Sequence, residues 1–179
     1  MAGAKHQQLE RVAAPVEPSS LDVAVPTTEL VSAEEDFHAW LVQQAEAVRQ
    51  QQHNRVDWAN LAEELDSMAR AERRELRSRL TTLLAHLLKW RYQAKRRSRS
   101  WEGTIARERI EIEDTLSEEP SLRSHLNETM EKAYRLARPS AGREMGLSKT
   151  QWEALFPREC LWQFEEILNE DFRPEIEPG

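Results

Sequence analysis

The stretch LTTLLAHLLKWRY, residues 80 to 92, decides the fold class of this chain. Its leucines recur at intervals of three and four residues, which is the spacing of one face of an α-helix. The same spacing extends back to Trp58, and no proline or glycine interrupts the chain between Trp58 and Tyr92. The pattern therefore predicts one nearly continuous helix with an apolar stripe along it. The stripe residues that we expect to be buried are Leu61, Leu65, Leu76, Leu80, Leu83 and Leu87.

Similar apolar repeats on either side of this stretch predict further helices. Ser32 and Glu35 have the spacing of a capping box, so the first helix is expected to begin there. Pro120 and Gly146 are expected to end two later helices, with an interruption of the second at Pro139. No segment alternates as a strand does, so the predicted fold class is all-α, a bundle of four main helices with short C-terminal helices. The expected ranges are 32–51, 58–92, 98 or 100 to 119, 121–146, 149–155 and 161–168.

The length of 179 residues allows one domain with a sizeable core, and we predict a single all-α domain over residues 32–174. Residues 1–31 contain three prolines and no sustained apolar period, which indicates a disordered leader, and residues 175–179 are expected to form a flexible tail. No apolar stretch reaches the roughly 20 residues of a membrane span, and the chain shows no secretory signal pattern. We therefore expect a cytoplasmic protein without membrane contact.

Basic residues are concentrated in the middle of the chain. Residues 70–100 contain 11 Lys and Arg against two Glu, a net charge of +9, which leaves −16 on the rest of a chain whose total is −7. Aromatic residues lie among these cations, a composition that suits phosphate binding and base stacking. The candidate binding patch consists of Lys89, Arg91, Lys95, Arg96, Arg97, Arg99 and Trp101.

The same basic segment also suits a junction between two helices. In a junction, Arg96 and Arg97 would pair with Glu108 and Glu111 of the following helix. The pI of the whole chain, near 5.4, disfavours nonspecific nucleic-acid binding and favours the junction.

A second candidate cluster lies on the long helix itself. Glu72, Arg79 and His86 lie seven residues apart, so all three follow one flank of that helix. They are a candidate polar network, either buried against a neighbouring helix or exposed along a wet edge. A histidine in such a position is more often a hydrogen-bonded boundary residue than a metal ligand.

The tryptophans are expected to serve mainly in packing, because large rings fill the irregular space between helices. Trp152 and Trp162 lie in the short terminal helices, which must either fold back over the bundle or face another chain. The tryptophans expected in the core are Trp40, Trp58, Trp90 and Trp101.

Short motifs occur along the chain in the order DFHAWL, DWANLAEEL, ERRELRSRL, LLAHLLKW, YQAKRRSRSW, PSLRSHL and FPREC. In this order they resemble the bacterial family called domain of unknown function twenty-nine. The resemblance covers about residues 34 to 173 and implies an all-helical bundle with no assigned activity. One position departs from the family pattern. Ala94 follows the YQ pair where a proline is expected, which favours a long helix that runs slightly further before it turns.

Residues suited to metal or acid–base chemistry are sparse. Glu35 and His38 form a Glu-x-x-His pair of the kind found in carboxylate-bridged metal sites, but the sequence has no second copy on another helix. We therefore expect no metal and no cofactor. Cys160 is expected to be a small apolar contact, and Glu64 lies about 33 Å from His86 along an unbroken helix. The sequence identifies no catalytic residue.

These observations favour a non-enzymatic interaction or self-association module, whose partner is another protein or a second copy of the chain. The alternative is a nucleic-acid-binding module that uses residues 89–101. A third hypothesis is a metal-dependent or acid–base hydrolase at an internal cluster of acidic residues and histidine.

Overall fold

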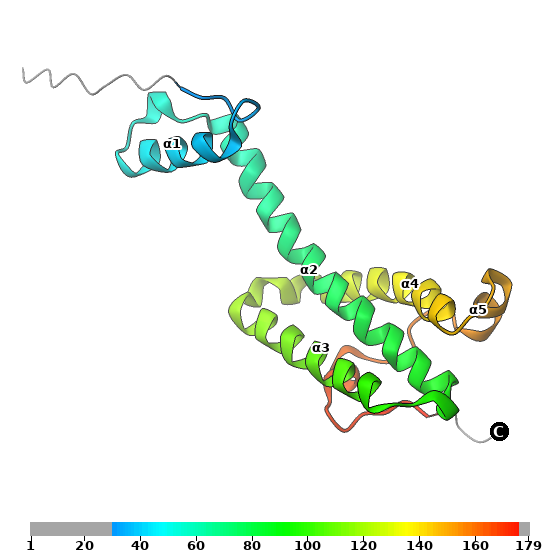
Figure 1. The fold of residues 1–179 in the computed structure, drawn as a ribbon. Helices are drawn as coiled ribbons and strands as arrows, with labels where there is room; N and C mark the ends of the chain where they lie inside the picture. The colour runs from blue at the N-terminus through cyan, green and yellow to red at the C-terminus, as the bar shows by residue number, and fades with distance from the viewer. Residues whose placement is uncertain (1–29, 176–179) are drawn as a thin grey trace, which may run out of the picture. The chain divides into compact units, whose positions relative to one another are not determined.

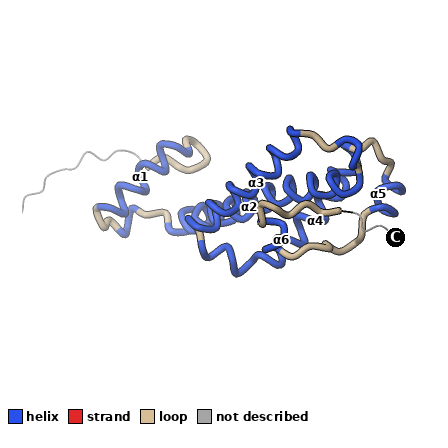
Figure 2. The backbone as a smooth tube through the Cα atoms, turned by 90° about the horizontal axis from the view of Figure 1, so that it is seen from below, coloured by secondary structure: helices blue, strands red, loops and turns tan. Residues whose placement is uncertain are grey.

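The computed structural model describes residues 30–175, and the chain forms two compact units that divide between Val56 and Asp57. Every regular element of these residues is helical (Figure 2), which confirms the predicted all-α class. Of the predicted leader, only Leu30 and Val31 lie within the described residues, and of the predicted tail only Glu175. The chain was predicted to form a single domain over residues 32–174, and that statement remains a prediction.

The first unit contains helix α1 (Phe37–Arg49) and a 3-10 turn (His53–Arg55). Asp36 caps α1, because its carboxylate accepts a hydrogen bond from the Ala39 amide at 3.0 Å. The buried face of α1 includes Trp40, on which the Phe37 ring stacks at 5.7 Å between centroids.

The predicted start of this helix at Ser32 is wrong. The capping-box contacts do form, since the Ser32 amide donates to the Glu35 carboxylate and the Glu35 amide donates to Ser32 Oγ, both at 3.2 Å. They close an isolated turn, because Asp36 then adopts an extended conformation with φ at −151°. The helix begins only after that residue.

The second unit is organised around α2 (Trp58–Tyr92), a helix of 35 residues whose bounds match the prediction. Asp57 caps it by accepting a hydrogen bond from the Asn60 amide at 3.2 Å. Helices α3 (Arg99–Glu118) and α4 (Leu126–Glu144) flank its second half (Figure 1). The fully buried leucines of α2 are Leu76, Leu80, Leu83, Leu84, Leu87 and Leu88.

The first half of α2 differs from the prediction. Leu61 is half-buried and Leu65 is 58% exposed, although both belong to the predicted buried stripe. Trp58 is likewise exposed, although it was expected in the core. Apolar spacing shows which face of a helix is apolar, but it does not show how far along the helix a neighbour covers that face.

The long helix does not gain length from Ala94. It ends at Tyr92, and a 3-10 turn (Ala94–Arg96) follows at once, so the expected extension is wrong. Ser98 then caps α3 by accepting a hydrogen bond from the Trp101 amide. The core side chains of α3 are Ile105, Ile112 and Leu116.

Two predictions about α4 are also wrong. The helix begins at Leu126, because residues 120–125 form a 3-10 turn that starts at Pro120. Pro139 does not interrupt it, and the helix continues to Glu144. Ala137 and Ala141 are fully buried on either side of the proline, and we attribute the tolerance of its missing hydrogen bond to this packing. Gly146 follows with φ at +74°, a left-handed conformation that suits glycine after a helix end.

The chain then turns back through α5 (Lys149–Leu155) and α6 (Phe164–Leu168). The range of α5 agrees with its prediction, and Ser148 with Gln151 forms its capping box. The last helix begins later than expected, after Gln163, whose amide donates to the Glu166 carboxylate at 2.7 Å. Within the described residues, no helix combines the length and apolarity that crossing a membrane requires.

We predict that Leu83→Ala lowers the free energy of unfolding by about 2–5 kcal/mol, because the side chain is fully buried where α2 meets the core. Met68→Ala serves as the matched control on the exposed half of α2 and should cost no more than about 0.5 kcal/mol. Urea denaturation of both variants measures the difference. Equal losses would show that the two halves of α2 are covered alike.

Candidate functional site

The residues of the basic candidate patch divide into internal and exposed groups. Lys89 is only 3% exposed, and its Nζ lies 2.5 Å from Glu144 Oε2 and 4.8 Å from the centre of the Trp101 ring. Burial raises the pKa of Glu144, but the hydrogen bond and charge of Lys89 outweigh burial, so the net pKa lies below its ordinary value. Lys89 therefore joins α2 to α4 and is not a surface cation.

Arg97 is also held within the fold. Its Nε donates to the Trp90 carbonyl at 3.0 Å, and its guanidinium lies 5.0 Å from the centre of the Trp90 ring. The Arg173 guanidinium approaches the same ring at 5.7 Å, and Glu175 lies 3.9 Å from Arg97. Arg91 is half-buried against the Tyr92 ring at 5.7 Å.

Lys95, Arg96 and Arg99 form the exposed group, and they make no ion pair with any described residue. The partners expected for Arg96 and Arg97 in a junction, Glu108 and Glu111, do not reach them. Arg79 of α2 binds both carboxylates instead, at 3.8 Å and 3.2 Å. The junction is thus built from the backbone and ring of Trp90, and the exposed cations are left facing solvent.

The predicted polar network is not a direct one. Arg79 pairs with Glu75 at 2.9 Å in addition to its two contacts with α3, whereas Glu72 is exposed and lies outside this cluster. His86 shares a 3.0 Å hydrogen bond between its Nδ1 and the Thr82 carbonyl. Burial lowers the pKa of His86, and the nearby Lys89 lowers it further, so the neutral ring is favoured near pH 7. The structure joins none of Glu72, Arg79 and His86 directly to another.

Sequence reasoning missed a buried arginine that binds three backbone carbonyls in the second unit. The guanidinium of Arg109 donates to the carbonyls of Ile167, Glu170 and Phe172 at 2.7, 2.9 and 2.9 Å. Burial, together with the charge of Arg173, lowers the pKa of Arg109 to about 10, so it stays protonated at pH 7. Its position between Ile105 and Ile112 on the apolar face of α3 was the signal that could have revealed a buried arginine.

Two further side chains fix the segment that follows α5. The Tyr134 hydroxyl donates to the Pro157 carbonyl at 3.0 Å, and Arg138 donates to the Phe156 carbonyl at 3.0 Å. Cys160 lies nearby and is half-buried, and burial raises the pKa of its thiol. A protonated thiol is a poor nucleophile, which agrees with the packing role expected for Cys160.

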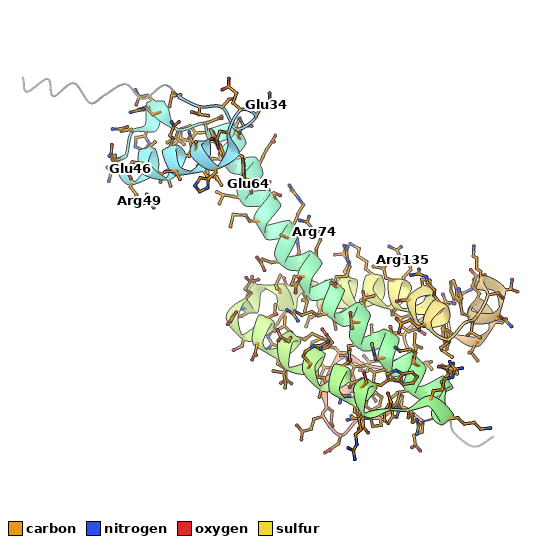
Figure 3. The ribbon with its side chains drawn as sticks, in the orientation of Figure 1. Glu34, Glu46, Arg49, Glu64, Arg74 and Arg135 are labelled. Atoms are coloured by element: carbon orange, nitrogen blue, oxygen red, sulfur yellow. The ribbon has the colours of Figure 1, made fainter. Side chains whose placement is uncertain are left out.

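An open groove of about 1450 Å³ lies between α4 and residues 153–165. Its lining includes five basic and five acidic side chains, with Arg135 and Glu131 among them. Figure 3 shows Arg135 projecting from α4. The lining side chains of the groove therefore carry no net charge at pH 7.

The residues of the metal and acid–base hypotheses are not assembled in the structure. Among the described residues, no three His, Cys, Asp or Glu side chains are grouped closely enough to hold a metal ion. The unbroken α2 keeps Glu64 about 33 Å from His86 along its axis, so these two cannot act as a pair.

A different feature of α2 is its exposed apolar surface. We call Trp58, Leu61, Leu65 and Met68 the α2 stripe. Their spacing of three, four and three residues places them on one side of the helix, and Leu65 and Met68 are 58% and 57% exposed. Other large exposed apolar residues of the second unit, such as Ile110 and Leu136, lie on different helices.

Comparison with known families identifies the chain. The model of the family described as "Domain of unknown function DUF29" matches residues 33–173. The chain belongs to the DUF29 family. This confirms the resemblance seen in the motifs, and the DUF29 match includes residues of both units. Searches of curated proteins and of solved structures found no match to this DUF29 chain.

We predict that Arg109→Met lowers the free energy of unfolding by about 3 kcal/mol or more, because it leaves carbonyls without a charged donor. Hydrogen exchange should increase mainly in residues 164–173. Arg99→Met is the matched control, since Arg99 lies on the same helix, is exposed and makes no ion pair with a described residue, and it should cost about 0.5 kcal/mol or less. A uniform rise in exchange across the second unit would contradict a local tether.

Proposed function

We propose that this DUF29 protein is a protein-interaction module that binds its partner through the α2 stripe. The observation that carries the proposal is the exposure of Leu65 and Met68 on consecutive turns of one helix. Isolated apolar residues are common on protein surfaces, but several on one helical face are typical of a binding surface.

The energetics of this surface support a binding role. Covering one leucine or methionine side chain contributes about 1.5–3 kcal/mol, so a partner that covers the stripe gains several such contributions. The stripe residues also have the spacing of the anchors with which an amphipathic helix binds an apolar groove or another helix. The packed second half of α2 keeps the first half helical, because helix propagation is easier than nucleation.

The chemistry-bearing groups of the second unit support binding over catalysis. Lys89 is paired with Glu144, Arg109 is bound to backbone carbonyls, and burial favours the protonated thiol of Cys160. Each of these groups has a structural use in the fold, whereas Leu65 and Met68 contribute little to the core.

Capture of partners from the host cell tests the proposal. Tagged wild-type protein should retain a defined set of partners, and Leu65→Ser with Met68→Ser should weaken that retention at least about tenfold, because two apolar contacts are lost. Ile110→Ser is the control, since Ile110 is equally exposed but lies on α3. Both variants should melt like the wild type. Retention of the same partners by the stripe variant would contradict the proposal.

Nucleic-acid binding is the second candidate, and the observation that favours it is the exposure of Lys95, Arg96 and Arg99 without ion pairs among the described residues. Only these three of the predicted patch face solvent as free cations. The acidic remainder of the chain opposes phosphate binding.

For this candidate, we expect that wild-type protein shows no salt-dependent binding to a mixed pool of single-stranded and duplex nucleic acid. Fluorescence anisotropy across a salt series measures it. Binding that weakens steeply with salt, and that Arg96→Glu with Arg99→Glu abolishes, would instead establish a nucleic-acid function. Arg123→Glu with Arg143→Glu is the control, since it makes the same change of charge at other exposed positions.

A further inference from the structure

We infer that the partner of the α2 stripe is a second copy of the same chain, paired antiparallel through the first half of α2. This inference rests on the interaction role proposed above and adds the identity and orientation of the partner. Three properties of the first half of α2 carry it: the spacing of its apolar residues, its length outside the core, and its charge distribution.

The spacing is that of a helix pair. Trp58, Leu61, Leu65 and Met68 alternate by three and four residues, as the core positions of a coiled coil do. Exposed alanines, Ala62 and Ala69, border the stripe, and small side chains there let a second helix approach closely. Residues 58–75 precede the first fully buried leucine and extend about 27 Å, enough for four layers of contact.

The charges on this part of the helix are segregated. Glu63, Glu64 and Asp66 give a net charge of −3 near its beginning. Residues 70–77 contain four arginines and two glutamates, a net charge of +2. Figure 3 shows Glu64 and Arg74 projecting from the two ends of this stretch.

This charge order makes the surface complementary to itself in one orientation. A two-fold pair uses the same patch on both copies, so the patch must complement itself. In an antiparallel pair the basic part of each helix runs toward the beginning of the other, where the acidic residues lie. A parallel pair would place acidic beside acidic and basic beside basic, which is unfavourable.

The charges also select the register. Packing Leu65 of one copy against Met68 of the other places Leu61 level with Glu72, and it places Glu63 level with Arg70. A pair centred on Glu63 would place Glu63 of one copy level with Glu63 of the other, and like charges in that arrangement repel. The first register is therefore the one we propose.

Sedimentation velocity tests the pairing. Wild-type protein at micromolar concentration should sediment with twice the monomer mass of 20.9 kDa. Leu65→Glu with Met68→Glu should sediment as a monomer with an unchanged circular dichroism spectrum, while the control Ile110→Glu stays paired. Added salt should weaken the wild-type pair, because opposite charges contribute to it.

Disulfide cross-linking tests the orientation in a Cys160→Ser background. In the antiparallel register, protein carrying Leu61→Cys should cross-link to protein carrying Glu72→Cys, whereas neither variant should cross-link to itself. In that register, two copies of the same cysteine lie about 16 Å apart along the helix axis. Self-cross-linking of each variant, without the mixed product, would overturn the antiparallel pair.

A wild-type protein that sediments at 20.9 kDa at every concentration tested would overturn the second copy as partner. The interaction role would survive that result if Leu65→Ser with Met68→Ser still lost a captured partner. If the stripe variants kept both the dimer mass and the captured partners, both proposals would be overturned.

Discussion

The leucine face of α2 from Leu76 to Leu88 is the constraint on which the second unit depends. These side chains leave water only if other helices cover them, and α3 and α4 do so from two sides (Figure 1). The covering helices bring their own apolar residues, such as Ile105, Ile112 and Ala133, into the same core. The leucine face ends before the first half of α2, where the Trp58, Leu65 and Met68 side chains are more than half exposed.

Charged and polar side chains then attach the C-terminal segment to this core. Arg109, Tyr134 and Arg138 all donate to backbone carbonyls of residues 156–172, a stretch whose only regular helix has five residues. A buried cation is tolerated only when its donors are satisfied, and three carbonyls satisfy Arg109. Lys89 is a second buried cation, and its hydrogen bond to Glu144 joins α2 to α4. These buried charged and polar groups therefore hold the C-terminal segment and α4 against the core.

The sequence predicted elements whose signals are local. Asp57 and Ser98 mark helix starts, and the unbroken run between them gave the bounds of α2, because capping and propensity act within a few residues. The predictions failed where contacts with residues distant in the sequence determine the structure. Leu65 is exposed because spacing does not show which elements cover it, and Pro139 is tolerated within a well-packed helix. Likewise Glu108 pairs with Arg79 instead of Arg97, and Arg109 was overlooked, since its carbonyl partners lie about 60 positions later in the chain.

The continuity of α2 has a geometric consequence. The buried leucines and the α2 stripe lie on one continuous helix. The number of residues between Met68 and Leu76 therefore fixes the angle between the stripe and the buried leucine face. Each residue added or removed there would turn the stripe by about 100° around the helix axis and shift it by about 1.5 Å, while leaving both surfaces chemically intact. The number of residues between Met68 and Leu76 therefore sets the direction of the stripe. Only insertions or deletions close to a whole number of helical turns would keep the stripe facing its present direction.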